Sequence, residues 1–380
     1  MSKKRLSRIP PAMISQGKPT PVPIYTEAGR LLLNQGNVIS SEKQVEQVIS
    51  RGFYEIQTDA LSRRGSKSDK GNASYDENPF AQYYQLLINL QNTFKSIGNK
   101  NPQSSQRLEK ISTRIVTMCQ YDVDAALGLV HVYAIDPSAY EQALLYGVLG
   151  GFAAQQLALN EKQTQSLVKA CLTANIALLP YADRLNRSRQ KLAEKQRSVV
   201  RRHPEIGAAM LDNASIKDSL CRKIVLQHHE CFDGSGYPNQ LTGDALSPMS
   251  KILAFIERYM AMTTKRAYKT RMSPNEAISN ILSSFEDDPH LSIFVRLSKA
   301  MTNYPPGSMV TLKNGEYGVI VRRNPSMKGH FLKALGSSNK LYMGPLSRET
   351  TSPEYQIAQA VIPKTPPAMD FSSIWGYSSS

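Results

Sequence analysis

The chain of 380 residues has little cysteine, and its four cysteines lie far apart at Cys119, Cys171, Cys221 and Cys231. None of them forms a Cys-x-x-Cys pair, which argues against a disulfide framework and a zinc site of the paired-cysteine kind. We interpret them as reduced thiols. The chain also lacks a run of about 18 uncharged apolar residues, and the basic segment 1–6 has no apolar stretch behind it. The sequence therefore predicts a soluble, cytoplasmic protein.

Acidic residues are scarce relative to basic ones, with 31 Asp and Glu against 46 Lys and Arg and a net charge of +15. Such an excess favours anionic partners, among them nucleotides, nucleic acid, membrane headgroups and acidic protein faces. One stretch is especially basic and contains Arg184, Arg187, Arg189, Lys191, Lys195, Arg197, Arg201 and Arg202. A solvated helix face explains it best, and a face that collects an anionic dinucleotide is the alternative. No signature of a nucleic-acid-binding domain is present, so we do not expect specific nucleic-acid binding.

The rhythm of apolar residues changes along the chain and divides it into parts. A helical stripe such as Leu144, Val148 and Phe152 is typical of the middle of the chain. A period of two with an Asn314-Gly315 hairpin signal follows it. We predict a small N-terminal α+β module at 1–60, a flexible linker at 61–77, a helical domain at 78–302, a small β appendage at 303–350 and a disordered tail at 351–380. The early helix 80–97 could pack outside the core or mediate a homodimer.

The segment 228–238, with the sequence HHECFDGSGYP, concentrates metal-ligand and turn chemistry. It reads as the end of a helix followed by a tight turn. Adjacent helical residues point about 100° apart, so His228 and His229 should not chelate one metal as an i, i+4 pair would. They suit a site with two metals, or one ligand and one helper. The glycines of the turn would let backbone amides approach a phosphate closely.

Together with the segment 202–207, RHPEIG, this HHE..DG.GYP string resembles the HD-GYP family. That family is a branch of the HD metal phosphohydrolases and hydrolyses cyclic di-GMP, a bacterial second messenger. The resemblance implies a mainly α protein built on an HD-type helical bundle, and it extends to the modules expected at either end. It also implies that Glu257 occupies the position of the last metal carboxylate. Arg266 matches an arginine that reaches a phosphate of the nucleotide, although a solvated cation is an equal alternative.

The chain departs from the family at the His-Asp pair. Counting back from Pro180 puts Leu172 and Thr173 at that pair, and a further family histidine aligns near Tyr140. In the family the aspartate bridges two metals and helps to activate a bound water. Its loss argues against binuclear hydrolysis, because a bridging hydroxide needs two cations to become a nucleophile near neutral pH.

The surviving ligands implied by the resemblance are His203, His228, His229 and Glu257. They could hold a single divalent metal (Fe, Mn or Zn) or none. His203, which precedes a proline, could equally bound a helix. His228 and His229 could be satisfied by backbone carbonyls, which we prefer to full metal occupancy. Glu257 lies on an apolar helix and needs a partner, either a metal, His228 or an arginine.

Two functions from different classes follow. The first is a non-hydrolytic receptor or adaptor that binds cyclic di-GMP or a related nucleotide, or a GGDEF-type cyclase or other signalling protein. The ligand-binding residues would be Asp233, Gly234, Gly236, Tyr237, Pro238 and Arg266, with Tyr237 either stacking on a guanine or packing the turn. The second is a weakly active cyclic di-GMP phosphodiesterase or phosphohydrolase with a reduced metal site. We assign no catalytic residue and lean against an enzyme.

Overall fold

The computed structural model describes residues 6–9, 14, 16–17, 20, 22–55, 78–181, 193–265, 270–324, 329–337, 340–363 and 369–377. The chain divides into two compact units. The first comprises residues 1–84 and 365–380, and the second residues 85–364. The predicted linker at 61–77 lies outside the described residues.

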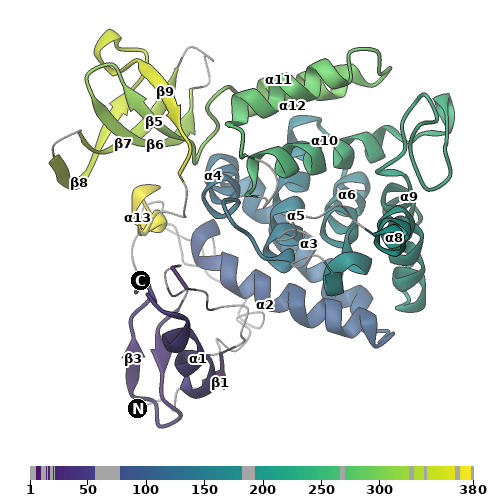
Figure 1. Cartoon of the computed structure of the whole chain (residues 1–380), viewed down its shortest axis with the longest axis horizontal. Helices are drawn as coiled ribbons and strands as arrows, with labels where there is room; N and C mark the ends of the chain where they lie inside the picture. Colours follow the sequence, from purple (N-terminus) through teal and green to yellow (C-terminus); the bar gives the residue numbers. More distant parts are fainter. Residues whose placement is uncertain are drawn as a thin grey trace, which may run out of the picture. The chain divides into compact units, whose positions relative to one another are not determined.

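The first unit contains a small antiparallel sheet and one helix (Figure 1). Its strands are β1 (Leu6–Arg8), β2 (Ile24–Tyr25), β3 (Leu31–Leu33) and β4 (Phe53–Glu55), in the order β1-β4-β2-β3. Helix α1 (Glu42–Arg51) begins after Ser41, whose hydroxyl caps the helix by accepting from the Gln44 N–H. The predicted α+β character of the N-terminal module is confirmed.

The C-terminal end of the chain also belongs to the first unit. Helix α13 (Phe371–Ile374) carries Phe371 and Trp375 against Phe80, at the start of α2 (Pro79–Gly98). The ring centroids lie 6.0 Å and 4.9 Å from that of Phe80. The predicted disordered tail at 351–380 excepted Phe371, Trp375 and Tyr377, which we expected to dock locally because aromatic rings offer apolar surface to bury. The local docking that we expected of Phe371 and Trp375 is confirmed.

The second unit is mainly helical, as predicted (Figure 1). Its helices are α3 (Ser104–Tyr121), α4 (Val123–Tyr133), α5 (Ala139–Gln156), α6 (Glu161–Thr173), α8 (Glu194–Asn213), α9 (Ser219–Gln227), α10 (Pro248–Thr263), α11 (Pro274–Ser284) and α12 (Leu291–Met301), with most of α2 beside them. Several begin where the sequence supplies a cap. Ser138 and Asn160 each form a capping box at the start of α5 and α6. The expectation that the early helix packs outside the core is wrong, because α2 buries Leu87, Leu90 and Phe94.

Helix α5 lies at the centre of the bundle, and its glycines set how closely the neighbouring helices approach. A Cβ at Gly147 would lie 2.6 Å from the Leu172 side chain on α6. A Cβ at Gly151 would lie 2.9 Å from the Cys119 sulfur on α3. These close approaches bring the C-terminal end of α6 into the bundle core, where Leu172 and Thr173 are fully buried.

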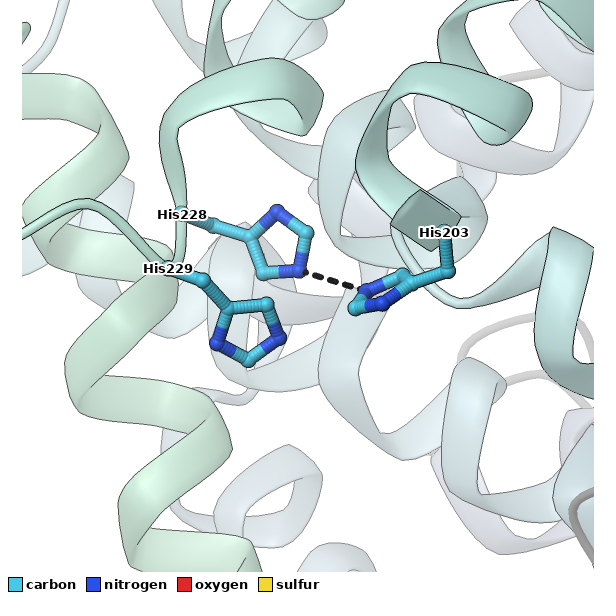
Figure 2. A group of neighbouring side chains, drawn as sticks. All are labelled: His203, His228 and His229. Carbon is cyan, nitrogen blue, oxygen red and sulfur yellow. Dashed lines mark hydrogen bonds between the residues drawn. The ribbon is translucent and has the colours of Figure 1, made fainter. Parts of the chain in front are cut away.

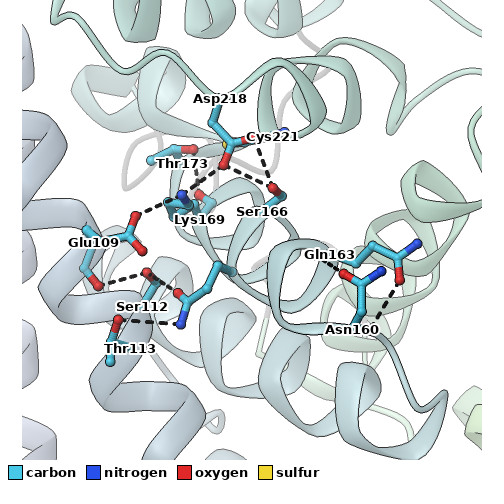
Figure 3. Close-up of polar contacts among 11 residues, drawn as sticks. Glu109, Ser112, Thr113, Asn160, Gln163, Ser166, Lys169, Thr173, Asp218 and Cys221 are labelled. Atoms are coloured by element: carbon cyan, nitrogen blue, oxygen red, sulfur yellow. Dashed lines mark hydrogen bonds and ion pairs between the residues drawn. The ribbon is translucent and has the colours of Figure 1, made fainter.

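Two ion pairs of the buried Lys169 join α6 to its neighbours (Figure 3). The Lys169 ammonium on α6 lies 2.9 Å from a Glu109 oxygen on α3 and 2.8 Å from an Asp218 oxygen at the start of α9. The Ser166 hydroxyl donates to Asp218. Burial opposes the charged form of Lys169, but its hydrogen bonds to Asp218 and Glu109 outweigh burial and raise the lysine pKa.

An antiparallel sheet follows the helices. Strands β5 (Met309–Leu312), β6 (Glu316–Arg323), β7 (His330–Ser337), β8 (Lys340–Glu349) and β9 (Ile357–Val361) lie in the order β8-β7-β6-β5-β9. The predicted hairpin is present, with Gly315 at a φ of +84° between β5 and β6. Strand β9 pairs with β5, so the β appendage extends beyond residue 350 into the segment predicted to be disordered.

The β appendage is attached to the helices by ion pairs. Arg322 and Arg323 on β6 bind Asp122 and Asp124 at the start of α4.

No helix among the described residues is long and apolar enough to cross a membrane.

Candidate metal and nucleotide site

Three histidines, one from α8 and two from the end of α9, converge on one another (Figure 2). His203 lies in α8, His228 is the C-cap of α9, and His229 follows it. One potential ligand atom from each histidine lies within 4.8 Å of the other two. A Glu257 oxygen, from α10, lies 3.6 Å from His228 Nε2 and 3.5 Å from His229 Nε2. The four metal ligands implied by the sequence therefore lie close together.

We expected that His228 and His229 would not chelate one metal as an i, i+4 pair would, and the structure brings their rings together in another way. That expectation assumed that both residues continue the helix, whereas α9 ends at Gln227. The backbone after the helix brings the two rings together, with centroids 4.2 Å apart. Their nitrogen atoms can therefore face one common point.

His203 does not bound a helix, which was the alternative that we considered for it. Pro204 lies inside α8, and the helix continues to Asn213. The His203 side chain is buried and points toward His228, with the two Nε2 atoms 3.2 Å apart (Figure 2).

The hydrogen bonds of His203 and His228 fit a bound cation. Each Nδ1 lies 2.6 Å from a backbone carbonyl oxygen, that of Val200 for His203 and that of Val225 for His228. Because a carbonyl can only accept, each Nδ1 carries a proton and donates it. In the neutral rings each Nε2 then carries a lone pair, and the two lone pairs face each other. A cation bound between them would accept both lone pairs and remove their repulsion. The predicted backbone hydrogen bonds of the histidines thus coexist with ligand geometry.

The electrostatics of the three rings favour the form that binds metals. Burial lowers the pKa of His203 and of His228 to about 4, and it lowers the pKa of His229 well below its usual value. All three imidazoles are therefore neutral near pH 7. A neutral imidazole is the ligand that Zn²⁺, Mn²⁺ and Fe²⁺ accept.

Glu257 has a partner that the sequence analysis missed. The side-chain amide of Asn175 donates to Oε1 of Glu257. Asn175 lies two residues beyond the end of α6, so this contact brings the segment aligned with the His-Asp pair to the site. An asparagine beside the segment that has lost its carboxylate was the signal available in the sequence.

Leu172 and Thr173, which we predicted to stand at the position of the His-Asp pair, make other contacts. The Thr173 hydroxyl donates to the Lys169 carbonyl one helical turn earlier, at 2.7 Å (Figure 3). Leu172 packs against Gly147. Tyr140, aligned with the further family histidine, has its ring 6.0 Å from that of Phe94.

The turn at 233–238 is held mainly by contacts within the chain. Asp233 Oδ1 accepts from the Ser235 N–H and hydroxyl, which lowers the Asp233 pKa. Gly234 has a φ of +77°, and a Cβ at Gly236 would lie 2.3 Å from the Cys231 nitrogen. Both glycines are thus required by the fold of the turn. Whether they also approach a phosphate stays a prediction.

Glu230 is a second residue whose role the sequence analysis missed. Its buried carboxylate accepts from the backbone N–H groups of Asn239 and Leu241, at 2.6 Å and 3.0 Å. It thereby fixes the chain after Pro238 and holds the turn beside the histidines. Its place in the HHE string was the available signal.

Tyr237 connects the turn with the histidines. Its ring stacks on His229, with centroids 4.6 Å apart and planes inclined by 22°. The Arg201 guanidinium lies 5.6 Å from the Tyr237 ring centroid. Arg266 lies outside the described residues, as do Arg184, Arg187, Arg189 and Lys191.

Comparisons with known proteins found one matching family model and several relatives. A family model described as an HD domain matches residues 138–291, which include the three histidines and Glu257. Cyclic di-GMP phosphodiesterase PA4108 of Pseudomonas aeruginosa is 30% identical over 202 residues, which cover 53% of this chain and 48% of that protein. The cyclic di-GMP phosphodiesterase response regulator RpfG of Xanthomonas campestris is 30% identical over 132 residues, or 34% of this chain and 35% of that protein.

Further comparisons extend the range of relatives. The 3'3'-cGAMP-specific phosphodiesterase 3 of Vibrio cholerae is 29% identical over 156 residues, which cover 40% of this chain and 33% of that protein. The chain thus spans about half or less of the length of these relatives. Among solved structures, Bd1817, described as an HDG"Y"P protein from Bdellovibrio bacteriovorus, covers 78% of this chain and is itself covered to 98%. Its TM-score is 0.49 and its sequence identity 15%.

Proposed function

From the premise that this chain belongs to the HD domain family, in its HD-GYP type, we propose that it binds a cyclic dinucleotide and does not hydrolyse it efficiently. Relatives named as cyclic di-GMP and 3'3'-cGAMP phosphodiesterases support this ligand class. The net charge of +15 suits a ligand that carries two phosphodiester charges.

One observation carries the proposal. The donors His203, His228, His229 and Glu257 are sufficient for one cation, while the neighbouring end of α6 contributes Thr173, turned to its own backbone, and Asn175, bound to Glu257. A second cation would need a carboxylate at that place. Without two cations, a bound water is not activated as it is in binuclear sites.

The chain's own residues would hold the metal and position the ligand. His203, His228, His229 and Glu257 supply the donor atoms for one Fe²⁺, Mn²⁺ or Zn²⁺. A single bound cation would polarise a phosphate oxygen. Glu230 and Gly236 keep the turn closed, and Tyr237 covers His229 from solvent.

A weakly active phosphodiesterase is the alternative, and the intact histidine geometry favours it. The cluster of three neutral imidazoles is the part of the family site that supports phosphate polarisation by one metal. Turnover at such a site would be slow, because only one cation would share the charge of the displacement.

We also propose a protein partner. A GGDEF-type cyclase or other signalling protein fits this role, because a protein that binds the messenger without hydrolysing it could act as an adaptor for the enzyme that makes it. A homodimer is a further proposal.

The test combines binding with product analysis. Calorimetric titration of the full chain with cyclic di-GMP should show binding, and chromatography after incubation with Mn²⁺, Fe²⁺ or Zn²⁺ should show no linear product. His228→Ala serves as the metal-site variant and His330→Ala, in strand β7, as the control. Product that forms with the wild type and with His330→Ala, but not with His228→Ala, would establish the weak enzyme instead. Absence of binding would refute the proposal.

A further inference from the structure

Arg201 extends the histidine cluster to the protein surface. It lies on α8 two residues before His203, and its side chain is exposed. Its guanidinium carbon lies 5.6 Å from the centroid of Tyr237, whose ring in turn stacks on His229. The three side chains form a stack from a candidate metal ligand to an exposed cation.

The charge of Arg201 is not neutralised by a carboxylate within the part of the chain that the structure describes. Arg202, the next residue, differs in this respect, since its Nε lies 3.5 Å from a Glu205 oxygen. These two adjacent exposed arginines on one helix therefore have different surroundings. Arg202 is paired with Glu205, and Arg201 lies over the Tyr237 ring beside the histidines.

Stacking prepares a guanidinium to bind a phosphate. Contact with a ring restricts the side chain while leaving the N–H donors at the edge of the guanidinium plane. Those donors match two phosphate oxygens, which a lysine ammonium cannot contact in the same paired way. A side chain that is ordered before binding also loses less entropy when the ligand arrives.

We propose that Arg201, stacked on Tyr237, binds one phosphodiester of the cyclic dinucleotide through two N–H donors. This inference rests on the proposed function and adds a ligand-binding residue to it. It places one phosphate at the outer face of Tyr237, next to His229 and so beside the metal ligands. The basic stretch before His203 then has one member with a specific role, while Arg202 contributes general charge.

The experiment is calorimetric titration of the full chain with cyclic di-GMP at one fixed salt concentration. Arg201→Ala should raise the dissociation constant for cyclic di-GMP by about tenfold to a hundredfold, which is the loss expected when a charge-assisted pair of hydrogen bonds is removed. The matched control Arg202→Ala removes the same charge one residue away. It should change the dissociation constant by less than about threefold, as expected of a solvated charge. Arg201→Lys should recover only part of the loss, and Zn²⁺ binding should be unchanged in all three variants.

Each other outcome has a definite meaning. Equal losses in Arg201→Ala and Arg202→Ala, or full recovery in Arg201→Lys, would overturn the role of Arg201 and leave the proposed function intact. A wild-type protein that does not bind the dinucleotide would overturn both. If Arg201→Ala proved unstable, Arg201→Lys compared with Arg202→Lys would decide, since both variants keep the charge and the long side chain.

Discussion

At the level of single residues, the candidate site combines three histidines and Glu257 with the uncharged side chains of Thr173 and Asn175 near the end of α6. The histidines are oriented by backbone carbonyls, and Glu257 is oriented by Asn175. These partners explain how the donors stay in place when the segment at Leu172 and Thr173 provides none. Asn175 is therefore the residue through which the strength of the metal site can be changed.

Replacing Asn175 by aspartate should tighten metal binding. The new carboxylate would lie beside Glu257, and two negative charges attract a cation more strongly than one. We expect the dissociation constant for Zn²⁺ or Mn²⁺ to fall by about tenfold. Calorimetric titration of metal into metal-free protein measures this, with Asn175→Ser as the uncharged control. Equal affinity in the two variants would show that residue 175 does not face the metal.

His131 provides a test of pH dependence away from the metal site. Its Nδ1 donates to the Leu127 carbonyl, and its Nε2 lies 2.6 Å from the Tyr259 hydroxyl. Burial lowers the pKa of His131 to about 4, against a usual value near 6.5, and Arg271 adds to the effect. The unfolded state therefore binds more protons between these values, so this residue makes the protein less stable as the pH falls from 6.5 to 4.

His131→Gln should reduce that slope. The glutamine does not titrate, so the free energy of unfolding should depend less steeply on pH than in the wild type across this window. Urea unfolding at pH 7.5, 6.5, 5.5 and 4.5 compares the two proteins. Parallel curves would mean that His131 titrates alike in the folded and unfolded states.

At the level of elements, α6 is held by charge and by close packing. Gly147 lets α5 approach Leu172, and Lys169 joins α3 and α9 to α6. The network is partly buried around Asp218, whose carboxylate would lose its cation if Lys169 were replaced. Asn175 lies two residues beyond α6, so the ion pairs hold the helix that leads to it.

Lys169→Met should lower the free energy of unfolding by about 1 to 2 kcal/mol, because the lysine is buried but its partners are partly exposed and water screens the lost attraction. Lys162→Met is the matched control, because Lys162 is exposed on the same helix and should change stability by less than about 0.5 kcal/mol. Denaturant unfolding measures both variants. Similar stability of the two would contradict the role of the network.

At the level of the whole molecule, metal binding and folding should be linked. The four proposed donors come from α8, from the end of α9 and from α10, so a bound cation would hold three elements together. A ligand that binds only the folded state stabilises it by about 2.7 kcal/mol at a hundred times its dissociation constant. The protein should therefore melt at a higher temperature with Zn²⁺ or Mn²⁺ than with EDTA.

His228→Ala should remove this thermal shift, and His330→Ala should keep it. Differential scanning fluorimetry with and without each metal measures the effect. A shift that persists in His228→Ala would mean that the stabilising cation binds elsewhere.

The helical class and the β appendage with its hairpin could be predicted from the sequence, because each depends on local periodicity or on a short motif. That the three histidines lie together also follows from short motifs, whereas their role as metal donors stays a prediction. The tight turn at 233–238 also follows from its residue types. Position 236 has to be glycine, because a Cβ there would collide with the Cys231 backbone nitrogen. The errors arose where distant segments meet. Strand β9 and helix α13 carry weak local signals and gain their structure from β5 and from Phe80.

The sequence by itself determined which chemical groups are available: three histidines, a glutamate, a glycine-rich turn and no His-Asp pair. Only the tertiary structure decided how they meet. His228 and His229 lie together because the helix ends at Gln227, and Asn175 reaches Glu257 across 82 residues of sequence because the segment after α6 packs beside α10. The physical reason is that residue identity fixes local preference and donor type, whereas the distances between donors depend on packing between elements far apart in the chain.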